Sequence, residues 1–71
     1  NVLIALGNSR DEKSLPAVQA RMNDSSDLVR GAAVWALREL LSEEKFHEVR
    51  TARRPKERSP EVLMEWDGTA I

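Results

Sequence analysis

Residues 29–37, "VRGAAVWAL", decide the fold because they set the smallest side chains of the chain beside its largest. Apolar residues recur here at helical spacing, in a stripe wide enough to be buried on more than one side. The stripe comprises Val29, Ala33, Ala36, Leu37 and Leu40, widened by Leu28, Ala32 and Trp35. A helix with such a stripe is expected to lie between two neighbouring helices.

The small residues of this helix predict a close contact with another helix. Gly31 costs about 1 kcal/mol of helix propensity relative to alanine. The usual compensation is close approach of a second backbone, so we expect Gly31 and the two alanines after it to touch a neighbour. Interiors are close-packed, and Trp35 should therefore fill the space where the two helices diverge. Trp35 and Trp66 are both expected in the core.

The first nine residues, "NVLIALGNS", resemble the last turns of a buried helix. Gly7 lies where a left-handed C-terminal cap belongs. The apolar run starts with neither an initiating methionine nor a capping residue before it. We therefore expect residues 1–71 to be a single domain from the C-terminal end of a larger protein, with the apolar face of its first helix needing cover.

A second helix is predicted between this segment and the central one. It begins near residues 12–14 and ends near Asn23, and Pro16 falls in its first turn, where a missing N–H has no partner to lose. Either Ser25 or Ser26 can then cap the central helix.

Two more helices are predicted in the C-terminal part. A thin apolar stripe around Phe46 indicates a helix in "EEKFHEVRTARR". The segment "SPEVLMEWDG" predicts another, with Ser59 as its cap and Gly68 at its end. The expected buried side chains of this last helix are Val62, Leu63 and Trp66.

The composition argues against an active site. The chain has no cysteine, which excludes disulfides and thiolate-bound metal or iron–sulfur centres within it. Its single histidine, His47, has no nucleophile or second metal ligand nearby. No acid–base pair or phosphate-binding loop is recognisable. We expect a cytoplasmic, non-catalytic domain without cofactor or metal.

Positive charge is concentrated in "RTARRPKER", residues 50–58, which hold five basic residues and one acidic residue. The basic residues are Arg50, Arg53, Arg54, Lys56 and Arg58. Arg53 and Arg54 follow Arg50 by three and four residues, so on a helix these three are expected to share a face and could follow a phosphate backbone. The alternative is a solvated helix end favoured by the helix dipole, or a flexible exit loop. No aromatic residue is interleaved with them, so base-specific recognition is not indicated.

Two arginines of the central helix have other predicted roles. Arg30 is expected to be structural, paired with a helix end or with Asp24 or Asp27. Arg38, two turns later on the same flank, is expected at the surface, where it could extend a basic stripe.

The sequence also repeats itself. Ala5-Leu6 recurs as Ala36-Leu37 at an offset of 31, and "SDLV" (26–29) recurs loosely as "SPEV" (59–62) at an offset of 33. Self-similarity at this period, with a helix, a short turn and a helix in each unit, indicates a helical solenoid.

The stretch "DLVRGAAVWAL", preceded by "NDSS" and "LPAVQARM", resembles HEAT-like repeats of the phycobilisome-lyase type. Their second helix opens with an acidic residue, then Val-Arg, then small residues ending in Ala-Leu. The resemblance is good over residues 1–42 and poor over 43–67. It implies an all-α fold: a short HEAT-like α-solenoid of about two helix pairs plus a degenerate C-terminal helix.

A narrower resemblance concerns "NVLIALGNS", "LVRGAAVWALREL" and "SPEVLMEW". Together these segments are similar to the C-terminal end of tRNA epoxyqueuosine reductases, which are cobalamin-dependent iron–sulfur enzymes of queuosine synthesis. The resemblance implies a parent oxidoreductase that carries cobalamin and 4Fe–4S clusters outside this chain. The present chain would be an accessory domain that packs on the catalytic portion and helps to hold tRNA through the basic residues of 50–58. The alternative is a docking scaffold with no nucleic-acid role.

Overall fold

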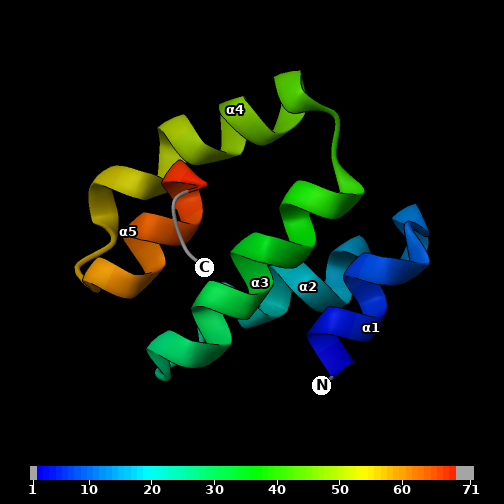
Figure 1. The fold of residues 1–71 in the computed structure, drawn as a ribbon, viewed down its shortest axis with the longest axis horizontal. Coiled ribbons are helices and arrows are strands. Elements are labelled where there is room, and N and C mark those ends of the chain that lie inside the picture. Colours follow the sequence, from blue (N-terminus) through cyan, green and yellow to red (C-terminus); the bar gives the residue numbers. More distant parts are fainter. Residues whose placement is uncertain (1, 69–71) are drawn as a thin grey trace.

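The computed structural model describes residues 2–68, which form five α-helices and two 3₁₀ turns (Figure 1). The helices are α1 (Val2–Ser9), α2 (Leu15–Arg21), α3 (Asp27–Leu40), α4 (Glu43–Arg53) and α5 (Pro60–Asp67). The turns are η1 (Glu12–Ser14), before α2, and η2 (Arg54–Lys56), after α4. The described part of the chain contains no strand, so the predicted all-α class is confirmed.

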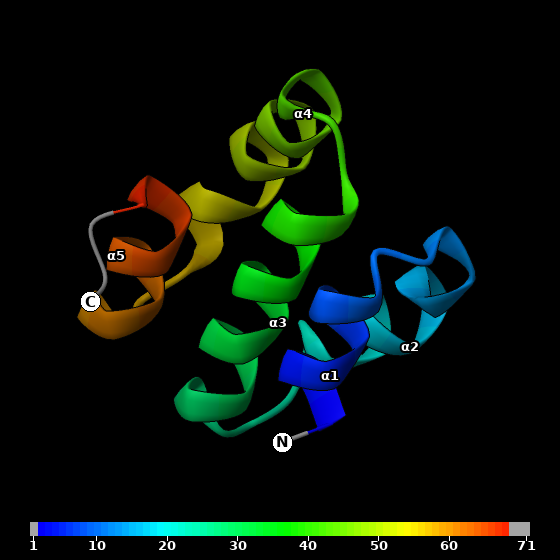
Figure 2. The ribbon, with the colours of Figure 1, turned by 45° about the vertical axis from the view of Figure 1, so that its right-hand side comes forward.

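The longest helix, α3, is the centre of the fold. It packs against α1 on one side and α5 on the other, while α2 covers a further face and α4 crosses near its C-terminal end (Figures 1 and 2). Alternate helices α1, α3 and α5 therefore lie side by side, as in a helical solenoid. The prediction that the central helix is buried between two neighbours is confirmed.

The core follows the predicted stripe with two differences. Ala33, Ala36 and Leu37 are fully buried, and the sequence pattern missed Val34, which is buried as well. Leu28 was expected to widen the stripe, but its side chain is 79% exposed, because it lies on a face of α3 that no neighbouring helix covers. The buried apolar residues are Leu3, Val18, Met22, Ala33, Val34, Ala36, Leu37, Leu40, Phe46, Val62 and Trp66.

The close helix contact exists, but a different glycine makes it. A Cβ atom added to Gly7 would lie 2.5 Å from Cζ3 of Trp35 and 3.1 Å from Cα of Ala36. A Cβ atom on Gly31 would meet nothing within 4 Å, so the prediction for Gly31 is wrong. Gly7 is the small residue that lets α1 approach α3, and the half-buried Trp35 lies across it. Trp66, also predicted in the core, is 3% exposed.

The predicted left-handed cap at Gly7 is also wrong. Because Gly7 is needed at the contact with α3, it stays helical and α1 continues to Ser9. The left-handed conformation falls instead on Arg10, with φ 54°. At the other end of the chain the prediction holds: Gly68 ends α5 with φ 73°.

The helix starts follow local chemistry. Ser26, one of the two predicted caps of α3, accepts a hydrogen bond from the N–H of Val29 at 3.4 Å. Ser59 occupies the N-cap position of α5 but does not cap it, since its hydroxyl hydrogen-bonds the carboxylates of Asp27 (3.1 Å) and Glu61 (3.0 Å). The α-helical part of the second helix starts at Leu15, preceded by the 3₁₀ turn η1.

Candidate functional site

The basic segment 50–58 covers the end of α4, the turn η2 and the link into α5. Arg50 and Arg54 lie one helical turn apart and both bind Asp67 at the end of α5. Arg54 forms two hydrogen bonds with this carboxylate, from Nε to Oδ1 and from Nη2 to Oδ2, both at 2.8 Å. Arg50 donates from Nη2 to Oδ1 at 2.8 Å, and from Nε to the carbonyl of Trp66 at 3.2 Å. These two arginines therefore fasten α4 to α5.

The electrostatic consequence falls on Asp67. A carboxylate at a helix C-terminus faces the negative end of the helix dipole, which is unfavourable by itself. Hydrogen bonds from Arg54 and then Arg50 overcome this and hold the pKa of the Asp67 carboxyl well below its usual range.

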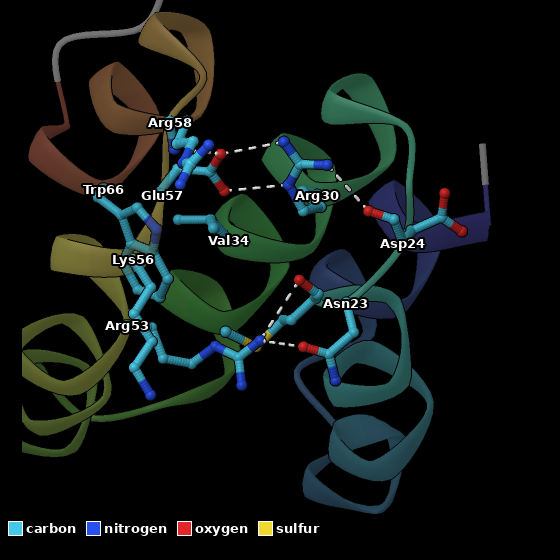
Figure 3. A pocket seen from close by; sticks show the side chains of 10 residues that line it. Asn23, Asp24, Arg30, Val34, Arg53, Lys56, Glu57, Arg58 and Trp66 are labelled. Carbon is cyan, nitrogen blue, oxygen red and sulfur yellow. Dashed lines mark hydrogen bonds and ion pairs between the residues drawn. The ribbon is translucent and has the colours of Figure 1, made fainter.

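Arg53 points to a different part of the molecule. Its Nη2 donates to Oδ1 of Asn23 at 2.5 Å and to the carbonyl of Met22 at 3.4 Å, just beyond the end of α2 (Figure 3). The prediction that the three arginines share one face therefore holds for Arg50 and Arg54, which bind the same carboxylate, and is wrong for Arg53. Arg53 and Arg54 are neighbours in sequence, so their side chains leave the backbone in different directions and reach different acceptors.

Lys56 and Arg58 complete the predicted set. Both side chains are exposed, and neither has a hydrogen-bond or ion-pair partner among residues 2–68. Of the five candidates, these two are the ones whose charge is not engaged within the described structure.

The basic segment forms one wall of a cavity of about 460 Å³, which we call the basic cleft (Figure 3). The opposite wall is the turn between α2 and α3, and the buried side chains of Val34 and Trp66 lie at its apolar base. The lining residues are Met22, Asn23, Asp24, Arg30, Val34, Arg53, Lys56, Glu57, Arg58 and Trp66. Four of these are cationic and two are acidic, so the lining carries a net positive charge.

Arg30 ties the two walls together. It donates from Nε and Nη2 to the two carboxylate oxygens of Glu57, both at 3.0 Å, and from Nη1 to the carbonyls of Asp24 (2.9 Å) and Ser25 (3.2 Å). Its predicted structural role is confirmed. Its acidic partner is Glu57, 27 residues away, instead of the carboxylate of Asp24 or Asp27.

Glu57 is fixed from two sides. Its side chain is only 11% exposed, and it also accepts the backbone N–H groups of Arg58 and Ser59 at 3.0 Å each. The hydrogen bonds from Arg30 lower the pKa of the Glu57 carboxyl despite its burial. Glu57 therefore anchors the link between η2 and α5 to the start of α3.

Arg38 was expected at the surface, and its side chain is 34% exposed, but it also has partners on α5 that the sequence pattern missed. Its Nη2 donates to the carbonyls of Glu65 and Trp66, the latter at 3.1 Å, and its guanidinium lies 4.9 Å from the centre of the Phe46 ring. The final carbonyls of a helix lack intrahelical partners and attract cations. Arg38 lies on the side of α3 that faces α5, so it can donate to these unpaired carbonyls and place a positive charge at the end of the helix. The sequence signal for this contact was Gly68, which marks where α5 ends.

The comparisons with known proteins agree with the helical architecture. Residues 15–43, which include α2 and α3, match the HEAT repeat family. No curated protein and no solved structure matches the chain significantly. Residues 15–43 therefore form a HEAT-like repeat, a kind of element that suggests protein interaction or scaffolding.

Two negative findings concern the described residues. None of the helices within 2–68 is both long enough and apolar enough to cross a bilayer. The same residues contain no group of three or more histidine, cysteine or acidic side chains placed to hold a metal ion.

Proposed function

We propose that this chain is a non-catalytic accessory domain that presents the basic cleft to the phosphate backbone of a tRNA. The observation that carries this proposal is that Arg53, Lys56 and Arg58 all line one cavity. Lys56 and Arg58 are exposed and unpaired within residues 2–68, so phosphate contacts would not displace an internal ion pair.

The strength of such binding can be bounded. Each phosphate contact reduces log K by roughly 0.7 to 0.9 per tenfold increase in salt. Two or three cations then predict weak, strongly salt-dependent binding by the isolated domain. The arginines that hold α5 to α4 contribute mainly by fixing the shape of the cleft.

The parent in this proposal is a queuosine-pathway reductase. The similarity of "LVRGAAVWALREL" and "SPEVLMEW" to the C-terminal end of epoxyqueuosine reductases supports it. Cobalamin and the 4Fe–4S clusters would belong to the catalytic portion of that parent, since this chain has no cysteine to ligate a cluster.

The test is a titration of the chain with the anticodon stem-loop of a queuosine-accepting tRNA, followed by NMR at low and high salt. We expect the largest shifts at residues 53–58 and binding that weakens steeply with salt. The double variant Lys56→Glu/Arg58→Glu should lower affinity about tenfold or more. The matched control is Lys13→Glu/Lys45→Glu, which makes the same charge change at two exposed residues outside the cleft.

Equal loss in both double variants would show that only net charge matters, and unchanged binding in the cleft variant would remove the basic cleft from the function. Arg50 and Arg54 are unsuitable for this test because their replacement would also release α5.

A second function is docking to protein, on the parent enzyme or on another partner. The match of residues 15–43 to the HEAT repeat family favours it, as do the large aliphatic side chains left at the surface, such as Val2 and Leu28. It is tested by calorimetry of this chain against the parent protein shortened to end before it. Association without tRNA would support docking, and association only when tRNA is present would support the nucleic-acid role.

A further inference from the structure

A second hollow, of about 320 Å³, lies between α3 and α5 on a different face of α3 from the basic cleft. We call it the outer groove. Its apolar surface comes from Leu28, Gly31 and Ala32 on α3 and from Met64 on α5. Leu28 is 79% exposed and Met64 45% exposed, so both can offer aliphatic surface to a partner. Above Gly31 there is open space, because an added Cβ atom would meet nothing within 4 Å.

The rim of the outer groove is acidic. Asp27, Glu61 and Glu65 line it, and no basic side chain does. Glu65 approaches a cation, Arg38, at 3.7 Å, whereas the carboxylates of Asp27 and Glu61 share hydrogen bonds with the hydroxyl of Ser59. Two rim carboxylates thus have a neutral hydroxyl as their side-chain partner within the described structure.

We propose that the outer groove binds a cationic amphipathic helix of a partner protein. An aliphatic side chain of the partner would lie over Gly31, between Leu28 and Met64, while flanking lysines or arginines would reach Asp27 and Glu61. This is the helix-in-groove mode of recognition, in which apolar anchors supply affinity and charges supply selectivity.

Charge complementarity selects this occupant over two others. The acidic rim repels a phosphate backbone, so the outer groove is not a nucleic-acid surface. A second copy of the chain would have to offer cations beside an apolar helix face. Its Arg50 and Arg54 are bound to Asp67 and its Arg53 to Asn23, and the two unengaged cations of its basic segment, Lys56 and Arg58, lie in η2 and in the link to α5, not on an α-helix.

The inference deepens the protein-docking role and is independent of the tRNA proposal. The two sites use different faces of α3: Arg30 and Val34 line the basic cleft, whereas Leu28, Gly31 and Ala32 line the outer groove. A variant of one site therefore leaves the other intact, and the two proposals can fail separately.

The test uses the full chain and a synthetic helical peptide of about 15 residues, with leucines on one face and lysines on the flanks. Binding is measured by calorimetry. A second peptide carries glutamate at every lysine position. We expect the lysine peptide to bind and the glutamate peptide not to bind.

The matched variants are Leu28→Ser and Val2→Ser, which each remove one highly exposed aliphatic side chain, 79% and 74% exposed respectively, only the first of them in the outer groove. Leu28→Ser should weaken binding of the lysine peptide about tenfold or more, with an unchanged melting temperature, and Val2→Ser should leave it unchanged. Glu61→Gln should weaken it by a smaller factor.

Four results would overturn the inference: no binding of the lysine peptide, equal binding of the glutamate peptide, equal loss in both serine variants, or a dimer in sedimentation that Leu28→Ser dissociates. The last would identify a second copy as the occupant. Failure here with cleft-dependent tRNA binding intact would leave the tRNA proposal standing.

Discussion

The two sides of α3 are held by different physics. On the α1 side, Gly7 lets two backbones approach until Trp35 lies directly against the glycine, and the contact is apolar. On the α5 side, arginines from α3, α4 and η2 bind the last carbonyls and the terminal carboxylate of α5. An apolar contact is stable over a wide pH range, whereas the ion pairs of Arg50 and Arg54 depend on the Asp67 carboxylate remaining ionised. The halves of this small domain should therefore respond differently to mutation and to acid.

The largest loss of stability should come from removing a buried apolar side chain of α3, the helix that both sides of the domain share. Leu37 is fully buried in α3. Leu37→Ala should lower the free energy of unfolding by about 2–5 kcal/mol, because the lost transfer energy and the cavity both count. Chemical denaturation followed by circular dichroism measures it. A loss below 1 kcal/mol would mean that α3 is not the shared core element.

Gly7→Ala tests the α1 side alone. The new methyl group would lie 2.5 Å from a ring carbon of Trp35 and 3.1 Å from the backbone of Ala36. The ring can move but the backbone cannot move cheaply, so we expect a loss of about 1–3 kcal/mol from overpacking, partly offset by better helix propensity. Tryptophan fluorescence should change with it. A neutral or stabilising result would show that α1 is not tightly packed on α3.

Acid should act on the α5 side. The carboxyl groups of Asp67 and Glu57 have pKa values in the folded state that arginine contacts lower below their usual ones. Between the folded and the unfolded pKa values the unfolded chain therefore binds more protons than the folded one. The free energy of unfolding rises with pH over that range. The contribution is complete above the unfolded pKa values of about 4 and is lost as the pH falls through the folded values.

The measurement is the melting temperature of wild type and Asp67→Asn between about pH 2 and pH 6. Asp67→Asn should flatten the acid limb, because the amide cannot gain or lose the charge that pairs with Arg50 and Arg54. Glu44→Gln is the control, since Glu44 is exposed and has no ion-pair partner within residues 2–68. Equal flattening in both variants would contradict a specific role for Asp67.

The same division explains what the sequence could predict. Apolar periodicity placed the helices, and local capping chemistry placed Gly68 and narrowed the cap of α3 to Ser25 or Ser26, because these signals act within a few residues. A glycine in the middle of a helix makes a close contact only where another helix lies beside it. Whether a helix lies there depends on the tertiary fold. The pattern therefore predicted the contact at Gly31, and the structure has it at Gly7.

The basic segment shows the same limit. Its positive charge was visible in the composition, but the sequence did not show which of its arginines bind which part of the fold. Arg53 finds Asn23, 30 residues away, and Arg54 finds Asp67, 13 residues away. Which arginine is engaged depends on acceptors that the fold brings near, and hydrophobic periodicity carries no information about them.

Gly31→Ala should have the smallest effect and the opposite sign to Gly7→Ala. Gly31 is helical, within α3, and a Cβ atom there would meet nothing within 4 Å. Alanine should then stabilise the helix by up to about 1 kcal/mol without a steric cost, which corresponds to a rise in melting temperature of roughly 4–8 °C for a domain of this size. A loss of stability would mean that another surface already fills the space above Gly31. The same chemical change at two glycines, opposite in sign, would locate the tight packing of this domain at the contact between α1 and α3.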